Sequence, residues 1–237
     1  MIRFDIITIF PSIFDSYFNE SIIKRAREKK LINIKIHDLR KFTKDKHLKV
    51  DDKPFGGGPG MVLKIEPLTK ALEMILQLRR PTSKSKKTSD VLIILLSVTG
   101  KQFDSKMAMQ FVKKYDHVVM ICGHYEGVDE RIKKVIHDLP RLPDGQGFKF
   151  YELSVGPYVL TGGELPAMTI VDSISRQILG VLGKSDSIEE NRYGVGVPAY
   201  TRPEIFHFKN KKYAVPKVLL SGNHKKIEDW RITHKKK

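Results

Sequence analysis

Residues 117–131 read His-Val-Val-Met-Ile-Cys-Gly-His-Tyr-Glu-Gly-Val-Asp-Glu-Arg. The apolar run at 117–121 predicts a strand buried on both faces, as in a parallel sheet. A glycine-bearing turn follows, and the charges of residues 126–136 lie mainly on one side of a predicted helix. Ligands of open parallel sheets collect at such strand ends, where backbone groups at a helix N-terminus are unpaired. The stretch therefore predicts an α/β fold and a candidate site at the turn.

Strand and helix patterns alternate on both sides of this stretch. Apolar or alternating runs predict strands at residues 2–9, 31–37 and 91–96. Helical spacing predicts helices at residues 11–18, about 20–30, 68–78 and 103–115. This alternation is typical of an α/β domain with a largely parallel sheet. Residues 41–61 predict a long loop of the kind that serves a ligand, whereas residues 81–89 and 139–150 have the composition of insertions.

The chain is strongly basic. Its 237 residues carry 43 Lys and Arg against 27 Asp and Glu, a formal net charge of +16, and 41% of them are apolar. This length and apolar content suffice for a packed core. The charge favours a polyanionic partner, nucleic acid first and an acidic membrane surface second, although lysines that only keep the surface soluble are an alternative. No apolar run approaches the roughly 20 residues that span a bilayer, so we expect no membrane partner.

The single cysteine, Cys122, lies in an apolar stretch and has no second cysteine to pair with. Neither a disulfide framework nor a cysteine zinc site can be built, which favours a reducing compartment. The N-terminal residues 2–9 read as a first buried strand and not as a signal or transit peptide. We therefore expect a cytoplasmic protein.

Two further segments are rich in glycine. One of them, residues 50–61, reads Val-Asp-Asp-Lys-Pro-Phe-Gly-Gly-Gly-Pro-Gly-Met. Its glycines let backbone N–H groups approach a phosphate or nucleotide closely; the alternative is a plain flexible loop. The P-loop pattern is not met, because Lys64 follows Met-Val-Leu. Residues 154–168 predict a short apolar strand, a turn at Gly162-Gly163 and a helix with Pro166 near its first turn. A second pocket lined by backbone is expected beside the first.

Competing patterns for small-molecule and hydrolytic enzymes are missing. No GxGxxG lies between a strand and a helix, and no G-x-S-x-G elbow occurs. His124 has no second His or Cys at metal-ligand spacing, so we expect no protein-held metal site there. The charged residues of the turn have a simple alternative interpretation as helix capping and solvated salt bridges; they are Glu126, Asp129, Glu130 and Arg131.

The glycine-rich and turn segments occur in order with four further blocks. These blocks are Asp172-Ser-Ile-Ser-Arg176, Gly180-Val-Leu-Gly183, Tyr200-Thr-Arg-Pro-Glu204 and Val215-Pro-Lys-Val-Leu-Leu-Ser-Gly-Asn-His224. The ordered set spans nearly the whole chain and closely resembles the bacterial tRNA (guanine-N1)-methyltransferases of the SPOUT class. The resemblance implies a trefoil-knotted domain with a mostly parallel sheet over residues 1–165. It further implies a connecting helix over 166–180, a small, shortened and mainly helical tRNA-binding domain over 181–237, and a homodimer with the active site at the subunit interface.

The resemblance also implies S-adenosylmethionine as methyl donor, held in the knot largely by backbone atoms. The positions that match the family's cofactor pocket are Leu96, Ser97, Gly123, Tyr125, Glu126, Gly127, Val155, Gly156, Pro157, Tyr158, Val159, Leu160, Gly162, Gly163 and Pro166. Two of the family's motifs differ here, with Pro157 in place of an Asp and Val98 in place of a Pro. A divalent ion such as Mg²⁺ is left open, since no ligand set for it is readable from the sequence.

The implied reaction places a methyl group on N1 of the guanosine 3′-adjacent to the anticodon. Neutral guanine N1 carries a proton that must leave, so a base is needed as well as alignment of the reacting atoms. In the family an Arg stabilises the charge on guanine O6 and an Asp of the partner subunit is the proposed base; these positions match Arg176 and Asn191. A neutral amide cannot accept the proton. Glu189 or Glu190 could supply the base instead, and we expect Glu190 to do so. Alternatively, the chain is a tRNA-binding, cofactor-binding relative with weak or no catalysis.

Binding to tRNA is expected to use basic and aromatic side chains of the loop and of the C-terminal segment. Lys53, Arg202 and His224 are the candidate contacts that we single out. Further lysines offer phosphate contacts, and Tyr200, Phe206 and His224 offer stacking; these lysines are Lys41, Lys44, Lys46, Lys49, Lys209, Lys211, Lys212, Lys225 and Lys226. Together they predict an affinity that falls as salt rises.

Overall fold

The computed structural model describes residues 1–77, 91–139, 147–183 and 196–235. The chain divides into two compact units, Met1–Val181 and Leu182–Lys237, and each is described here by itself. The polar insertion expected at residues 81–89 lies outside the described residues, as does most of the one expected at 139–150.

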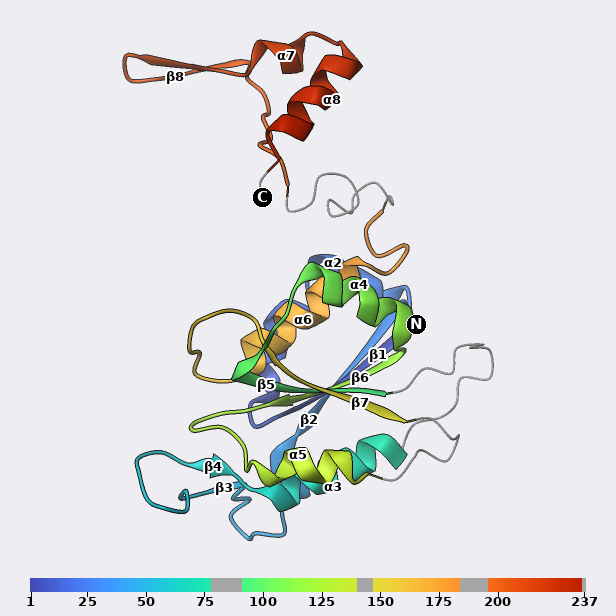
Figure 1. Ribbon diagram of the computed structural model, residues 1–237, viewed down its shortest axis with the longest axis vertical. Helices are drawn as coiled ribbons and strands as arrows, with labels where there is room; N and C mark the ends of the chain where they lie inside the picture. Colours follow the sequence, from blue (N-terminus) through green and yellow to red (C-terminus); the bar gives the residue numbers. More distant parts are fainter. Residues whose placement is uncertain (78–90, 140–146, 184–195, 236–237) are drawn as a thin grey trace. The chain divides into compact units, whose positions relative to one another are not determined.

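The first unit is built on one five-stranded sheet (Figure 1). Its strands are β1 (Ile2–Thr8), β2 (Ile32–Asp38), β5 (Val91–Gln102), β6 (His117–Cys122) and β7 (Phe148–Ser154). They lie in the order β2-β1-β6-β5-β7, and every neighbouring pair is parallel. The predicted α/β class with a mostly parallel sheet is confirmed. In such a sheet both faces are buried, which explains why β5 and β6 are apolar at successive positions.

Helices cover both faces of this sheet (Figure 1). On one face lie α3 (Ile65–Gln77) and α5 (Arg131–His137), and on the other lie α2 (Ser21–Glu28), α4 (Ser105–Lys114) and α6 (Glu164–Arg176). Alternate residues of β6 enter the two cores: Val119 packs with the α3–α5 side and Val118 with the α4–α6 side. Each face therefore has its own apolar cluster.

Short elements complete the two units. In the first unit they are η1 (Pro11–Phe14), α1 (Asp15–Phe18), η2 (Leu39–Phe42), β3 (Asp51–Asp52) and β4 (Val62–Leu63). The second unit contains the antiparallel pair β8 (Ile205–Phe208) and β9 (Lys211–Ala214), followed by α7 (Lys217–Leu220) and α8 (His224–Thr233).

The helix predicted from residue 126 begins five residues later, at Arg131. The backbone of residues 126–129 forms a turn that pairs with the glycine-rich loop instead: the Glu126 N–H donates to the Met61 carbonyl and the Asp129 N–H donates to the Leu63 carbonyl, both at 3.0 Å. Gly127 has a φ of 109°, which no helix accommodates. The expected salt bridge at this helix start is present, since Arg131 contacts Asp129 at 2.6 Å.

Two further boundaries differ from the expectation. β7 begins at Phe148, inside the segment interpreted as an insertion, and the apolar segment after Ser154 is irregular backbone, not a strand. The Ser154 hydroxyl donates to the Gly156 carbonyl at 2.8 Å, and the Tyr158 N–H donates to the same carbonyl at 2.9 Å. These local bonds replace ladder bonds and end the strand.

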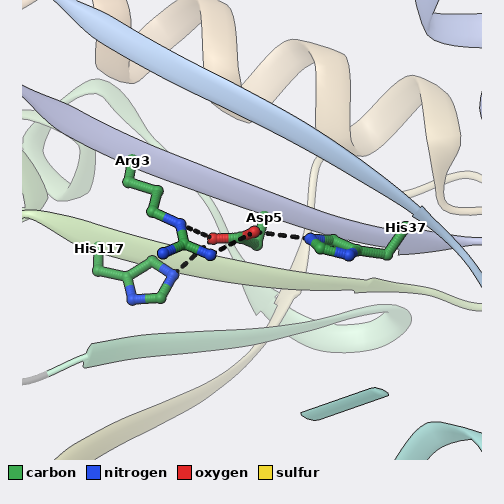
Figure 2. A network of polar contacts seen from close by, with 4 residues as sticks. All are labelled: Arg3, Asp5, His37 and His117. Carbon is green, nitrogen blue, oxygen red and sulfur yellow. Dashed lines mark hydrogen bonds and ion pairs between the residues drawn. The ribbon is translucent and has the colours of Figure 1, made fainter. Parts of the chain in front are cut away.

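A buried ionic network joins three neighbouring strands of the sheet, β1, β2 and β6 (Figure 2). Asp5 of β1 is fully buried and contacts Arg3 Nε at 2.5 Å, His37 Nε2 of β2 at 2.6 Å and His117 Nε2 of β6 at 2.7 Å. Burial alone would raise the pKa of Asp5, but the hydrogen bonds with His117, His37 and Arg3 hold that pKa well below its usual range. The carboxylate therefore stays ionised and ties β1 to both its neighbours.

Candidate functional site

A cavity of about 370 Å³ opens where β5, β6 and β7 end. It is lined by the strand-end segments 95–99, 123–128, 152–156 and 158–163, together with Glu130 and Pro166. Carboxyl ends of parallel strands meet at one edge of a sheet, so segments far apart in the sequence converge there. The volume lies within the range of roughly 300–1,000 Å³ that is usual for small-molecule sites.

Glycines allow two of these segments to touch. The Gly163 N–H donates to the Gly123 carbonyl at 2.8 Å, which joins the start of α6 to the end of β6. A Cβ on Gly163 would lie 2.7 Å from the Cα of Cys122, and one on Gly162 would lie 2.5 Å from Nδ1 of His124. Any side chain at either position would push the two walls of the cavity apart, so the site requires glycine there.

The glycine-rich loop of residues 56–60 meets the cavity through Glu126. A Cβ on Gly60 would lie 2.5 Å from Oε1 of Glu126, so the loop backbone packs directly against this side chain. Tyr125 beside it has a φ of 58°, a conformation that is uncommon for a large side chain and is found at functional sites more often than elsewhere. The glycine-rich loop therefore supports the cavity from behind Glu126, although no residue of the loop lines it.

The cavity is acidic although the chain is basic. Glu126, Glu130 and Glu152 line it, and Lys133 bridges two of them, at 2.7 Å from Glu130 and 2.9 Å from Glu152. Burial alone would raise the pKa of Glu152, but hydrogen bonds from Lys133, Ser97 and Thr99 lower it below its ordinary value. Three carboxylates against one ammonium favour a ligand that carries positive charge.

A buried polar contact lies beneath the cavity. The Thr8 hydroxyl at the end of β1 donates to Oε1 of Glu164 at 2.7 Å, and Nδ1 of His124 lies 3.9 Å from the other carboxylate oxygen. Glu164 is only 5% exposed. Burial, reinforced by the Glu164 charge, raises the pKa of the Cys122 thiol well above its ordinary value. The cysteine is thus a buried packing residue and no nucleophile.

The structure brings the expected cofactor positions together. All of them except Pro157 line the cavity; that they bind the cofactor stays a prediction. The expected set lacked ten of the lining residues, among them the polar side chains of Thr99, Glu130 and Glu152. Glu152 falls in β7, a strand that the Pro/Gly composition of the preceding residues concealed.

The other expected site residues lie apart from this wall or outside the described residues. Arg176 is the half-buried last residue of α6, whereas Glu190 and Asn191 lie outside the described residues. Lys53 is exposed just after β3 in the first unit. In the second unit Arg202 is exposed in irregular backbone, and His224 is the exposed first residue of α8.

The described residues contain neither a metal-binding cluster nor a membrane-spanning helix. Among residues 1–77, 91–139, 147–183 and 196–235, no group of three or more His, Cys, Asp or Glu side chains is arranged to hold a metal ion. Within the same ranges, no helix has both the length and the apolar character needed to cross a membrane.

The fold and the cavity define a class: a parallel-sheet α/β protein with a pocket of small-molecule size at its strand ends, built from glycine backbone and carboxylates. The model of the family described as tRNA (Guanine-1)-methyltransferase TrmD matches residues 2–237. The chain belongs to this family.

Relatives of known name are similar to this chain over almost its full length. A tRNA (guanine-N(1)-)-methyltransferase of Dictyoglomus turgidum is 46% identical over 234 residues, which are 98% of this chain and 84% of the relative. Enzymes of the same name from Carboxydothermus hydrogenoformans and Clostridioides difficile are 44% and 45% identical over 232 residues, covering 97% of this chain and 81% and 90% of the relatives. The family resemblance expected from the ordered motifs is confirmed.

Proposed function

We propose that this chain transfers a methyl group from S-adenosylmethionine to N1 of the guanosine 3′-adjacent to the anticodon of tRNA. The observation that carries the proposal is the full-length family match, combined with a cavity that gathers the family's motif positions in one place. We assign cofactor binding to residues 1–165, the connection to residues 166–180 and tRNA binding to residues 181–237. A cytoplasmic location follows from this substrate.

The cavity fits the chemistry of S-adenosylmethionine. The cofactor bears a sulfonium and an ammonium, and Glu126, Glu130 and Glu152 supply the opposite charge. The adenine of the cofactor needs hydrogen bonds at its edge. The irregular backbone of residues 155–160 can provide them, because few of its N–H groups are used in β-sheet hydrogen bonds. When bound, the cofactor supplies an activated methyl group. Whether a divalent ion assists is a separate question, which activity measured with and without Mg²⁺ addresses.

The residues of this chain then have two tasks. The first is to align guanine N1 with the methyl group, which accounts for most of the catalysis of a displacement reaction. The second is to manage charge: Arg176 stabilises the negative charge that develops on guanine O6, and Glu190 takes the N1 proton in place of Asn191. If Glu190 does not reach N1, the chain acts as a tRNA-binding, cofactor-binding relative with weak catalysis.

The homodimer and the knot belong to the same proposal. Large apolar side chains stay exposed on and beside α6 and on the α1 region, among them Val159, Leu165, Leu179 and Tyr17, which supports a buried subunit interface there. α1 and α6 are neighbours, because Tyr17 hydrogen-bonds Asp172. The knot is supported by the path after β7: the chain leaves the sheet edge, passes the end of β5 and contacts Gly123 at the end of β6.

Methyl transfer into an unmodified tRNA transcript tests the proposal. With labelled S-adenosylmethionine, we expect incorporation into a transcript with guanosine at the target site and none into a matched transcript with adenosine there. Primer extension should stop at the modified base, because N1 methylation blocks pairing. Glu190→Gln should abolish transfer, and Glu189→Gln is the matched control.

Three outcomes separate the possibilities. Transfer that is unchanged in Glu190→Gln removes Glu190 as the base. No incorporation by the unaltered protein, with S-adenosylmethionine still bound in calorimetry, favours the binding relative. Absence of both binding and transfer contradicts the proposed function.

A further inference from the structure

The hairpin formed by β8 and β9 is exposed at every position from Ile205 to Ala214. Its strands pair antiparallel in register, and the Val215 N–H extends the ladder by donating to the Glu204 carbonyl at 2.9 Å. The segment contains three lysines and no acidic residue. An isolated two-stranded hairpin is at best marginally stable, so an exposed one that carries large apolar side chains is better explained by a partner than by folding.

One face of the hairpin gathers its aromatic rings. Phe206 pairs with Tyr213, and Phe208 pairs with Lys211, so these four side chains share a face. The rings of Phe206 and Phe208 are nearly parallel, with an interplanar angle of 11° and centroids 6.5 Å apart. Both side chains remain more than half exposed, at 55% and 54%. These two nearly parallel, accessible rings are called the platform below.

The turn of the hairpin keeps a lysine where glycine or asparagine is favoured. Lys209 has a φ of 51°, in the left-handed region that disfavours residues with a Cβ. In this conformation its ammonium lies 5.6 Å from the centroid of the Phe208 ring. The left-handed backbone thus places a cation over the ring of Phe208, where the ring's π electrons attract it.

We propose that the β8–β9 hairpin is a stacking platform for unpaired bases of the tRNA, with Phe206 and Phe208 against base faces and Lys209 and Lys211 against the adjoining phosphates. The proposal rests on tRNA being the substrate and names how the second unit recognises it. Aromatic rings beside lysines, without any carboxylate, complement a single-stranded polyanion with accessible π faces. Paired stems hide their base faces, so the platform selects loop nucleotides.

Substitutions that remove the aromatic rings but keep the apolar volume test the platform. In Phe206→Leu with Phe208→Leu the apolar volume is largely kept and the π faces are lost, and we expect the Kd for unmodified tRNA to rise by roughly 5- to 150-fold for each base that stacks. Phe206→Tyr with Phe208→Tyr keeps the rings and should bind within about twofold of the unaltered protein. Ile205→Ala removes an apolar side chain from the opposite face and is the matched control.

The lysines have a different signature. Lys211→Gln should reduce the slope of log K against log salt by about 0.7, the value for one phosphate contact on a single strand, whereas the leucine variant should leave that slope unchanged. Lys209→Gly relieves the left-handed strain, so it should leave the unfolding midpoint unchanged or higher while weakening tRNA binding. A purely structural role for Lys209 predicts no loss of binding.

The outcomes distinguish this inference from the proposed function. If the unaltered protein binds and methylates tRNA but the leucine variant binds equally well, the platform is wrong and the function stands. If the leucine variant instead dissociates the protein in sedimentation without changing tRNA affinity, the face contacts a second copy of the chain and the inference is overturned. If the unaltered protein does not bind tRNA, the proposed function itself fails.

Discussion

Replacing Asp5 by Asn should destabilise the first unit, because Asp5 is the acceptor that Arg3, His37 and His117 share. The carboxylate can only accept hydrogen bonds, so Nε2 of both His37 and His117 must donate to it, as does Nη2 of Arg3. An Asn amide keeps one acceptor oxygen but turns an NH₂ group toward these donors. At least one buried donor then loses its partner.

The expected loss of unfolding free energy is about 3 kcal/mol, or roughly 150-fold in the folding equilibrium constant. This is the lower end of the range for breaking a buried ion pair, because the Arg3 side chain is 18% exposed and solvent screens part of its charge. Urea denaturation followed by circular dichroism measures the change. Asp138→Asn, an exposed change after α5, should stay within about 0.5 kcal/mol of the unaltered protein.

The pH dependence has a defined sign. The pKa of Asp5 is lower in the folded chain than in the unfolded one, where it is near 3.9. Its contribution is therefore fully present above about pH 4 and is lost as the pH falls through the folded value. The difference in unfolding free energy between the unaltered protein and Asp5→Asn should shrink as the pH falls below about 4. A difference under about 0.5 kcal/mol at pH 7, or one that grows on acidification, would refute the reasoning.

Three further predictions concern the cavity and the residues packed around it. Gly163→Ala places a Cβ 2.7 Å from the Cα of Cys122, so the free energy of unfolding, measured by thermal unfolding, should fall by roughly 1–3 kcal/mol. Calorimetry should show weaker binding of S-adenosylmethionine by this variant. The control Gly183→Ala, whose Cβ would meet nothing within 4 Å, should change neither quantity. The Cys122 thiol, whose pKa burial raises, should resist a thiol reagent at pH 8 in the folded protein and react fully in denaturant; rapid reaction without denaturant contradicts its burial. Glu152→Gln should weaken S-adenosylmethionine by about threefold to tenfold and S-adenosylhomocysteine, which lacks the sulfonium charge, by less. An equal loss for both ligands would show that the carboxylate does not sense that charge.

The strand and helix content of the first unit was readable because its signals are local. The run at residues 117–121 is apolar at successive positions, as only a strand covered on both faces requires, and the structure places it in the sheet between β1 and β5. The helix that begins near Pro166 was equally clear from its spacing and starts at Glu164. Patterns of this kind depend on neighbours within one or two turns, which the sequence displays directly.

The errors fall where distant segments decide the backbone. Residues 126–129 have a helical composition, yet their N–H groups bond to carbonyls of the loop at Met61 and Leu63, so α5 starts late. β7 was hidden because its first residues follow a Pro/Gly segment and its pairing partner, β5, lies some 50 residues earlier. No local pattern records such a long-range bond.

By itself the sequence determined the family, the parallel α/β class and most of the positions that line the cavity, because ordered motifs and apolar periodicity are properties of the chain. Only the tertiary structure decided that Glu152 and Glu130 share Lys133 in that cavity, that Gly163 must lack a side chain to pass Cys122, and that Asp5 holds three strands together. It also decided that Phe206 and Phe208 share an open face. These features depend on distances between segments, and such distances exist only once the chain has folded.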